Sequence, residues 1–309
     1  MRAAGPVDIT FIAAHAMTGR AAEETDTMSS TNFALKDRIA VVTGASRGIG
    51  AAIAKRLAAE GATVVCTART VEDGSEIPGS LSRTVKIIGE MGGKAVAIQC
   101  DVANAASRAS MVAQVLEQFG RIDILVNNAA GGAFETLEQI THTSFQWQFE
   151  INVFGPLELC QLVIPGMRER GWGRIVNISS AQAKIPEGPP FLPNDRYYGP
   201  MVYGMTKVAL NRMTAGLAAE CEGSGIAVNG VGPVSAVYTE GVAHKLKDHA
   251  VRSDPLWKEE PVESMAEAAL ALCLVDPAVT SGKSVYSGDY LQEIGQPIYN
   301  LDGRSVLAS

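Results

Sequence analysis

The sequence has no long apolar run and no excess of positive charge. No stretch of about 18 or more apolar residues occurs along the chain, which predicts that it has no transmembrane helix. The 26 Lys and Arg residues are outnumbered by 33 Asp and Glu residues, giving a formal net charge of -7. A general nucleic-acid-binding protein needs a basic surface, so this class is excluded. We therefore expect a cytoplasmic protein with neither a nucleic-acid nor a membrane partner.

Cysteine is scarce, and its positions show no grouping. The five cysteines lie far apart, mostly within apolar segments, and none belongs to a Cys-x-x-Cys pair or a His/Cys cluster. A metal site or a redox pair would need such grouping. We therefore expect no bound metal and five buried free thiols in a reducing compartment. The five are Cys66, Cys100, Cys160, Cys221 and Cys273.

The first 32 residues do not fit the pattern of the rest of the chain. Their apolar patch is weak, and an acidic cluster of Glu23, Glu24 and Asp26 suits neither a signal peptide nor a transit peptide. We expect residues 1–32 to be a disordered or non-native extension, with Met28 as an alternative start. No compositional break follows, so residues 33–309 are predicted to form a single domain.

What the chain does contain, from Lys36 onward, is an alternation of short β-branched runs and helical patterns. Strands separated by helix-length segments imply right-handed crossovers and a parallel sheet covered on both faces. The runs are almost continuously apolar, as strands in such sheets are. We predict an α/β fold, a doubly wound Rossmann-type parallel sheet of about seven strands. The expected strands cover residues 39–43, 63–67, 95–99, 122–126, 174–178, 226–230 and 282–287.

A glycine-rich turn, TGASRGIG at residues 43–50, connects the first predicted strand to the first predicted helix. Gly44 permits a sharp turn, Gly48 lets the backbone approach a pyrophosphate, and Gly50 lets the helix pack closely on the strand. Free N–H groups and the helix dipole would then face the phosphates of a dinucleotide. The cofactor-binding residues expected in this turn are Gly44, Ser46, Arg47, Gly48, Ile49 and Gly50.

A tyrosine and a lysine spaced as i and i+4, Tyr203 and Lys207, fall within a helix predicted over 201–222. Such positions share one helix face, about 6 Å apart along the axis, so both side chains point into the same site. A tyrosine with a pKa of about 10 is poorly matched to neutral pH, and a nearby ammonium group lowers that pKa by stabilising the phenolate. The pair is therefore a candidate general acid/base for carbonyl chemistry.

Several motifs occur in the order typical of one enzyme family. After TGASRGIG come CDV at 100–102, NNAAGG at 127–132, IN at 151–152, IVNISS at 175–180 and YGMTK at 203–207. The chain resembles the short-chain dehydrogenases/reductases over about residues 35–291. The resemblance implies subunit contacts through the helices predicted over 141–168 and 201–222, and hence a homodimer or homotetramer.

The resemblance also implies roles for individual residues. Ser180 would bind the substrate oxygen, with Ser179 as the alternative, and Tyr203 would transfer the proton. Asn152 would position a water beside Lys207, and Lys207 would also hold the nicotinamide ribose. Asp101 would contact the adenine of the cofactor, and Val102 would form a wall of the adenine pocket. Further cofactor contacts are implied at Asn128, Ala129, Pro233 and Ala236.

The end of the second predicted strand bears on which cofactor is used. In this family an acidic residue there holds the ribose 2′-hydroxyl of NAD, whereas cations bind the 2′-phosphate of NADP. Ala68 occupies the acidic position, and Arg69 and Arg47 offer two cations on the same side. Glu72 and Asp73 lie too far along the loop to replace the missing carboxylate. The sequence therefore favours NADP over NAD.

Two segments depart from the common family pattern. After the sixth predicted strand comes GPVSAVYTEG at 232–241, in which Val234 replaces the usual glycine. This segment, with a Pro-Gly in the loop after the second strand, resembles the hydroxysteroid-dehydrogenase-like subgroup and gives Ala236 the backbone contact with the carboxamide. An insert also lies within 185–199. Its Tyr197 and Tyr198 would line the substrate mouth, contact a neighbouring subunit, or pack within the loop.

Together these features predict an NADP-dependent oxidoreductase that interconverts an alcohol and a ketone or aldehyde by hydride transfer, with Tyr203 as general acid/base. An apolar, proline-rich stretch over 185–192 favours a hydrophobic substrate. One alternative is reduction of an activated C=C bond, as in enoyl thioester reductases, which needs a different proton-donor geometry. The other is a non-catalytic NADP-binding sensor. The complete set of Asn152, Ser180, Tyr203 and Lys207 argues against the sensor.

Overall fold

The computed structural model describes residues 33–133, 135–191, 201–245 and 258–307. The N-terminal extension and the insert's Tyr197 and Tyr198 lie outside the described residues, so the expectations for them stay predictions. The chain from Phe33 onward forms one compact unit.

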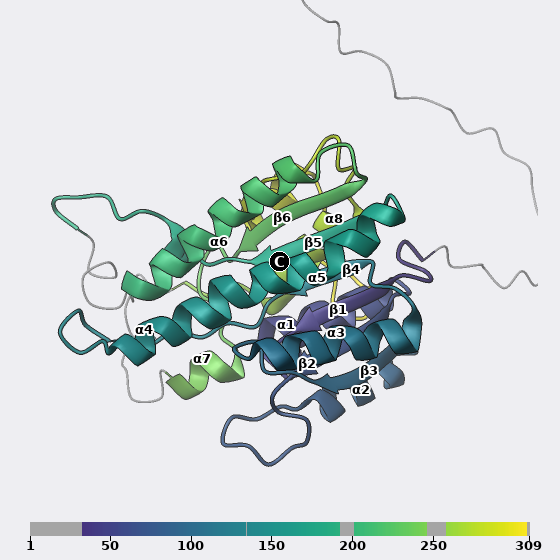
Figure 1. Ribbon diagram of the computed structural model, residues 1–309, viewed down its shortest axis with the longest axis horizontal. Coiled ribbons are helices and arrows are strands. Elements are labelled where there is room, and N and C mark those ends of the chain that lie inside the picture. The colour runs from purple at the N-terminus through teal and green to yellow at the C-terminus, as the bar shows by residue number, and fades with distance from the viewer. Residues whose placement is uncertain (1–32, 134, 192–200, 246–257, 308–309) are drawn as a thin grey trace, which may run out of the picture. The chain divides into compact units, whose positions relative to one another are not determined.

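A parallel sheet of seven strands, in the order β3-β2-β1-β4-β5-β6-β7, forms the centre of the fold (Figure 1). This topology confirms the predicted doubly wound α/β fold. Ligands of such sheets bind beyond the carboxyl ends of the strands where the strand order reverses, here between β1 and β4. The strands are β1 (Ile39–Thr43), β2 (Thr63–Ala68), β3 (Lys94–Gln99), β4 (Ile124–Asn127), β5 (Gly173–Ile178), β6 (Ile226–Gly232) and β7 (Ser284–Tyr286).

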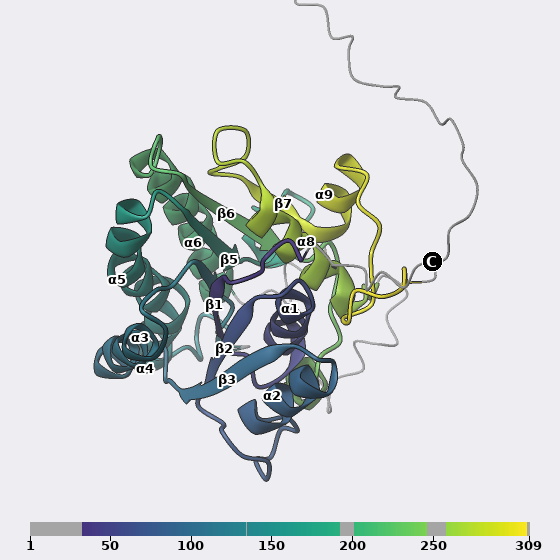
Figure 2. The same ribbon diagram turned by 90° about the vertical axis from the view of Figure 1, so that its right-hand side faces the viewer.

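Two layers of helices cover the sheet (Figure 2). One layer holds α1 (Gly48–Ala59), α2 (Leu81–Glu90), α8 (Val262–Leu274) and α9 (Ser287–Glu293). The other holds α3 (Ala105–Phe119), α4 (His142–Phe149), α5 (Gly155–Glu169) and α6 (Met201–Glu220). A short helix, α7 (Glu240–Lys245), follows β6.

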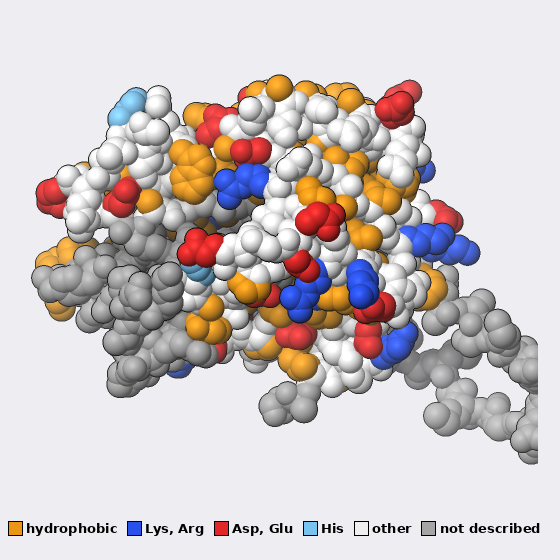
Figure 3. Space-filling model, turned by 90° about the horizontal axis from the view of Figure 1, so that it is seen from below, with side chains coloured by type: hydrophobic (Ala, Val, Ile, Leu, Met, Phe, Trp, Pro, Cys, Tyr) orange, Lys and Arg blue, Asp and Glu red, His pale blue; other side chains and the backbone are white. Residues whose placement is uncertain are grey.

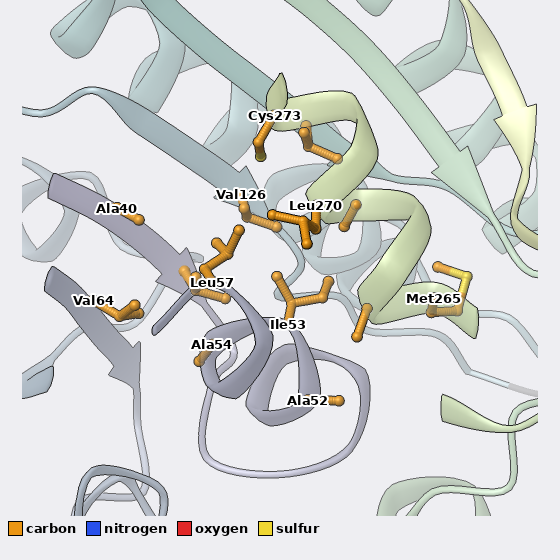
Figure 4. Close-up of a cluster of buried hydrophobic side chains, with 14 of the residues drawn as sticks. Ala40, Ala52, Ile53, Ala54, Leu57, Val64, Val126, Met265, Leu270 and Cys273 are labelled. Carbon is orange, nitrogen blue, oxygen red and sulfur yellow. The ribbon is translucent and has the colours of Figure 1, made fainter. Parts of the chain in front are cut away.

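Helices α1 and α8 meet over the sheet through apolar side chains (Figure 4). Ile53 and Leu57 of α1 lie toward Leu270 of α8, and each of the three is at most 2% exposed. Burying one such side chain contributes about 1.5–3 kcal/mol. The core therefore anchors α1, whose first residue belongs to the glycine turn.

The five cysteines are all buried and unpaired, as expected. Burial raises the pKa of Cys66, Cys160 and Cys273 to about 12. These thiols therefore stay protonated at neutral pH and act as small apolar side chains of the core.

The helix predicted over 141–168 is in fact two helices joined by a wide turn. Helix α4 begins after Thr141, whose hydroxyl oxygen accepts from the N–H of Ser144 at 3.1 Å. A π-helical turn over Glu150–Phe154 then separates α4 from α5. Pro156, near the start of α5, lacks the N–H that an α-helix would offer to the carbonyl of Asn152. The wide turn thus places a functional candidate, Asn152, at the junction.

None of the helices within the described ranges is long and apolar enough to cross a membrane. Figure 3 shows the molecule from below the view of Figure 1, with acidic and basic side chains interspersed over the described part of that face.

Candidate active site

The turn between β1 and α1 is built around glycine. Gly44 and Gly48 have φ values of 68° and 55°, in the left-handed region that favours glycine. A Cβ atom on Gly50 would lie 2.4 Å from the carbonyl oxygen of Gly44, so the close approach of helix and turn requires glycine there. The turn therefore exposes bare backbone at the start of α1, where N–H groups and the helix dipole favour an anion.

A pair of side chains from β1 and the end of β4 holds this turn in place. The side-chain amide of Asn128 donates to the carbonyl oxygens of Thr43, at 2.8 Å, and Gly44, at 3.3 Å. In return, the hydroxyl oxygen of Thr43 accepts from the N–H groups of Asn128 and Ala129, each at 3.0 Å. Asn128 thus supports the cofactor site through the turn. Thr43 was not among the residues predicted from the sequence, although a hydroxyl that closes an apolar strand was a usable signal.

Two arginines, Arg47 in the glycine turn and Arg69 after β2, influence each other electrostatically. Ala68 is the last residue of β2, and Arg69 after it is exposed. The guanidinium of Arg47 donates to the carbonyl oxygen of Gly79 at 2.8 Å. Burial lowers the pKa of Arg47, Glu240 opposes this effect, and the charge of Arg69 adds to it. The two guanidinium groups therefore lie within electrostatic reach of each other, as expected from the sequence.

A buried arginine that the sequence analysis missed supports the predicted adenine pocket. Arg108 of α3 is 1% exposed and donates to the carbonyl oxygen of Val102, just after β3. The same guanidinium donates to the carboxylates of Glu150 and Glu158, each at 2.9 Å. Because Glu150 opens the π-helical turn, Arg108 joins the adenine side to the turn that holds Asn152. An arginine on an amphipathic helix is normally exposed, so no local pattern indicates this burial.

Three of the predicted catalytic residues meet where β5 ends and α6 begins. The hydroxyl of Ser180, just beyond β5, lies close enough to the phenol of Tyr203 to lower the pKa of the tyrosine. The Oγ of Ser180 also accepts from the N–H of Gln182 at 3.2 Å, so the serine caps the 3-10 turn Ala181–Ala183. The Nζ of Lys207 lies 5.6 Å from the ring centroid of Tyr203, as the i, i+4 spacing predicts.

The neighbouring serine has different surroundings. Ser179 is 8% exposed, and its Oγ has no hydrogen-bond partner among the residues that the structure describes. Its backbone N–H donates to the carbonyl oxygen of Val231 at 2.8 Å, as a residue extending the sheet does. The geometry thus favours Ser180 over Ser179 as the residue that faces Tyr203.

The electrostatics of the pair differ from the expectation in one respect. Burial raises the pKa of Tyr203, and the hydrogen bond with Ser180 partly offsets this. Lys207 is 2% exposed, and burial lowers its pKa to about 8. Its Nζ donates to the carbonyl oxygen of Ile178 at 2.8 Å. The expected lowering of the tyrosine pKa by Lys207 is therefore not found in this structure, because the amine is turned toward Ile178.

Asn152 uses its whole side-chain amide to position other groups. Its Oδ1 accepts from the N–H of Gly131 at 3.0 Å, and its Nδ2 donates to the carbonyl oxygen of Gly131 at 2.7 Å. The Nδ2 also donates to the hydroxyl of Thr206 at 3.0 Å, which in turn donates to the carbonyl oxygen of Tyr203. The side chain thus ties the segment after β4 to α6. The water-holding role implied for Asn152 stays a prediction.

The two glycines of NNAAGG pack against aromatic rings. A Cβ on Gly131 would lie 2.2 Å from the Cη2 of Trp147. A Cβ on Gly132 would lie 2.8 Å from the Cδ2 of Tyr203. The bare backbone of Gly132 therefore forms the surface against which the Tyr203 ring rests. Both glycines belong to a motif recognised in the sequence, but this packing role was not predicted.

The segment after β6 is anchored through its backbone. The N–H of Ala236 donates to the carbonyl oxygen of Lys258 at 3.1 Å, and the carbonyl of Ala236 accepts from Glu260 at 2.9 Å. Ala236 thus has its N–H engaged, which leaves the second lone pair of its carbonyl for the carboxamide contact that the resemblance implies. Pro233, expected to contact the cofactor, is half-buried at the start of this segment.

The motif order and geometry agree with comparisons to known proteins. The sequence pattern of the family described as short chain dehydrogenase matches residues 38–250. The chain belongs to the short-chain dehydrogenase/reductase family. An uncharacterized oxidoreductase of Methylorubrum extorquens is 34% identical over 256 residues, which cover 81% of this chain and 96% of the relative.

Two further proteins are similar to this chain. The 7alpha-hydroxysteroid dehydrogenase of Escherichia coli K12 is 28% identical over 274 residues, 86% of this chain and 99% of the relative. The crystal structure of a 3-oxoacyl (acyl-carrier-protein) reductase from Agrobacterium tumefaciens with NADP bound has a TM-score of 0.69 and 28% identity, covering 83% of this chain and 95% of that one. The protein is thus a short-chain oxidoreductase of the NAD(P)-dependent type that acts on CH–OH and C=O groups.

The residues present fit a nicotinamide dinucleotide. The backbone around Gly44 and Gly50 leaves no room for a Cβ. The N–H of Gly48 already binds an anionic group, since it donates to the Oε2 of Glu240 at 3.1 Å. The buried amine of Lys207 lies at the other end of the site, beyond β5.

Proposed function

We propose that the protein is an NADP-dependent oxidoreductase that interconverts a hydrophobic alcohol and its ketone or aldehyde. The observation that carries this proposal is the meeting of the Ser180 and Tyr203 side chains beyond β5, with the buried Lys207 on the same face of α6 as the tyrosine. A carbonyl oxygen placed between the two hydroxyls would accept a hydrogen bond from each. Such placement polarises the carbonyl and stabilises the developing alkoxide.

The proposed chemistry assigns one task to each residue. When bound, the cofactor supplies the hydride for reduction or accepts it in oxidation. In the reductive direction, Tyr203 gives its phenolic proton to the alkoxide oxygen, while Ser180 holds that oxygen in place. Proton transfer leaves a phenolate on Tyr203. Lys207 stabilises this phenolate after the lysine Nζ has turned from Ile178 toward the tyrosine. Asn152 positions Tyr203 through Thr206, and it would hold a water beside the lysine, as the resemblance implies.

The preference for NADP is proposed from the end of β2. Arg47 and Arg69 interact electrostatically, and the strand ends in Ala68 rather than in a carboxylate. Two neighbouring cations suit a 2′-phosphate, which carries more negative charge than a ribose hydroxyl. The NADP bound to the Agrobacterium reductase supports the same choice. The turn of Gly44, Ser46, Gly48 and Ile49 would hold the pyrophosphate, and Asp101 with Val102 the adenine.

A hydrophobic substrate is proposed from the loop that follows Ser180. Ile185 is 79% exposed in this loop, and Phe191 is also exposed. The Pro-Val-Ser-Ala-Val segment that begins at Pro233, and the relationship to the 7alpha-hydroxysteroid dehydrogenase, support a place in the hydroxysteroid-dehydrogenase-like subgroup.

A homodimer or homotetramer is proposed from the outer surfaces of α5 and α6. These helices, or the turn before them, expose five large apolar side chains, and an apolar groove runs along α6. Helices with such surfaces normally bury them against another subunit. The exposed side chains are Phe154, Leu162, Met201, Met205 and Val208.

The proposed function is tested by comparing wild type with Tyr203→Phe in NADPH oxidation against ketones, aldehydes and enoyl thioesters. Wild type should turn over at least one carbonyl substrate. Tyr203→Phe should lose at least about 100-fold in kcat, because the proton donor is gone, while its Kd for NADPH stays close to that of wild type. Equal rates would refute the role of Tyr203. Turnover of enoyl thioesters alone would favour the C=C reductase, and tight NADPH binding without turnover would favour the sensor.

A further inference from the structure

The first residue of α7 places a carboxylate on the phosphate-binding turn. The Oε2 of Glu240 accepts from the N–H of Gly48 at 3.1 Å. The carboxylate also acts on two cations of the same region, because it raises the pKa of Arg47 and of Lys55 against the lowering caused by burial. A negative side chain is therefore held where the start of α1 and two basic groups favour an anion.

Helix α7 reaches across the glycine turn through further contacts. The Cβ and Cγ2 of Thr239 lie 3.0 Å from where a Cβ of Gly48 would be, so the threonine rests on the bare backbone of that glycine. The hydroxyl oxygen of Thr239 accepts from the N–H of Val242 at 3.3 Å, within the first turn of α7. At the other end, the Nε2 of His244 lies 3.6 Å from the Oε1 of Glu76 in the loop after β2.

The N–H of Gly48 cannot serve Glu240 and a pyrophosphate together. One N–H donates one strong hydrogen bond, and two anions at this distance would repel each other. The methyl group of Thr239 also covers the backbone that a pyrophosphate must approach. Binding of the dinucleotide therefore requires that Glu240 and Thr239 leave the turn, and that the start of α7 moves with them.

We propose that Glu240 is an internal occupant of the phosphate-binding turn, which holds α7 over the cofactor site until the pyrophosphate of the cofactor displaces it. The proposal rests on the proposed cofactor role of Gly48. As a consequence, the apparent affinity for NADP is lower than the intrinsic affinity, because Glu240 must leave the turn before the cofactor binds. Glu240 would thus set cofactor affinity without taking part in the chemistry.

The size of the effect follows from the exposure of the contact. Because the Gly48–Glu240 hydrogen bond lies at the surface, water competes with it and screens the charges. We therefore expect removal of the carboxylate to tighten NADP binding by about fivefold, the effect of one modest charged hydrogen bond.

The test is a calorimetric titration of the full-length protein with NADP⁺ and, separately, with adenosine 2′-phosphate, which has no pyrophosphate. Glu240→Gln and Glu240→Ala are compared with wild type. Glu263→Gln is the matched control, because the Glu263 carboxylate also raises the pKa of Lys55 but is not hydrogen-bonded to the turn. Both Glu240 variants should bind NADP⁺ about fivefold more tightly, with little change for adenosine 2′-phosphate and none for Glu263→Gln. In the cofactor-free proteins, hydrogen exchange over residues 240–245 should be faster in the Glu240 variants.

Three results would overturn the inference. NADP⁺ affinity in both Glu240 variants that equals or falls below that of wild type would mean that the carboxylate does not compete. Equal tightening for both ligands, or the same tightening in Glu263→Gln, would mean that the effect is only general charge. If wild type bound neither NADP⁺ nor NAD⁺, the proposed cofactor role itself would fail. If wild type and both Glu240 variants bound NADP⁺ equally well, the proposed cofactor role of Gly48 would stand, and only the displacement of Glu240 by the pyrophosphate would be refuted.

Discussion

The hydroxyl of Ser180 lies close enough to Tyr203 to lower the pKa of the tyrosine, whereas the Oγ of the adjacent Ser179 finds no partner in the described part of the chain. Two neighbouring serines at the end of one strand therefore have opposite surroundings. One faces the tyrosine beyond the sheet, and the other is packed inside. The same substitution at each serine can therefore serve as the control for the other.

Replacing each serine by alanine separates their roles. Ser180→Ala should lower kcat by about 100-fold or more, because it removes a hydrogen bond to the reacting oxygen. Ser179→Ala should leave kcat near the wild-type value and leave thermal stability unchanged or slightly higher, since its unpaired hydroxyl is replaced by an apolar group. Steady-state kinetics and thermal unfolding of both variants check this. A large loss of kcat in Ser179→Ala alone would reverse the assignment.

Lys207→Met should stabilise the cofactor-free protein while abolishing activity. The pKa of Lys207 is lowered from 10.5 to about 8 by burial, so the folded state disfavours the charged amine. Below pH 8 this penalty is fully present. It declines as the pH rises toward 10.5, because the unfolded chain then binds more protons than the folded one. We expect a gain of about 1–2 kcal/mol at pH 7, after the lost hydrogen bond to Ile178 is subtracted.

Denaturant unfolding of Lys207→Met and wild type at several pH values measures this gain. The stability difference should be largest below pH 8 and shrink above it. Lys86→Met is the control, because Lys86 is exposed on α2 and should give a small difference that does not depend on pH in this way. A Lys207→Met protein that is less stable than wild type across the whole range would contradict the inferred burial penalty.

Gly132→Ala should disturb the position of Tyr203 without disturbing the fold. The added Cβ would lie 2.8 Å from the Cδ2 of the ring, so the ring must shift. Misplacement of a proton donor by a fraction of an ångström costs about 10-fold or more in kcat. The Kd for NADP should stay within about twofold of wild type. Gly89→Ala in α2, where a Cβ meets nothing within 4 Å, is the control and should leave both constants unchanged.

Ala68→Asp should shift the cofactor preference from NADP toward NAD. The new carboxylate would repel the 2′-phosphate and could accept a hydrogen bond from the ribose hydroxyl. We expect the ratio of Kd values for the two cofactors to change by at least about 10-fold. Glu72→Gln tests the nearest natural carboxylate, which accepts from the hydroxyl of Ser82 at 2.7 Å, and should leave the ratio unchanged. A shift in Glu72→Gln would show that the ribose reaches farther along the loop than we propose.

The sheet and the glycine turn could be predicted from the sequence because their signals are local. Strand β1 has the bounds that the β-branched run at 39–43 indicated, and the φ values of Gly44 and Gly48 are those that the turn requires. The i, i+4 relationship of Tyr203 and Lys207 is local as well, since α6 carries both. Patterns of this kind are decided within a few residues of sequence.

What could not be predicted depends on partners that are distant in sequence. The contact between Gly48 and Glu240 joins residues 192 positions apart, and no local pattern announces it. The π-helical turn at 150–154 interrupts a segment whose apolar spacing indicates one continuous helix. The contact of the Lys207 amine could not be predicted for a related reason, because it depends on the carbonyl of Ile178 in another element.

The buried guanidinium of Arg108 has a consequence for variation at the protein surface. It is shared by the carbonyl of Val102, beside the predicted adenine pocket, and by Glu150, at the start of the turn that carries Asn152. Its third partner, Glu158, has a side chain that is 42% exposed on α5. A substitution at Glu158 therefore perturbs the supports of both ends of the cofactor site, although this residue takes no part in the proposed chemistry. We therefore expect fewer substitutions to be tolerated at Glu158 than the exposure of its side chain suggests.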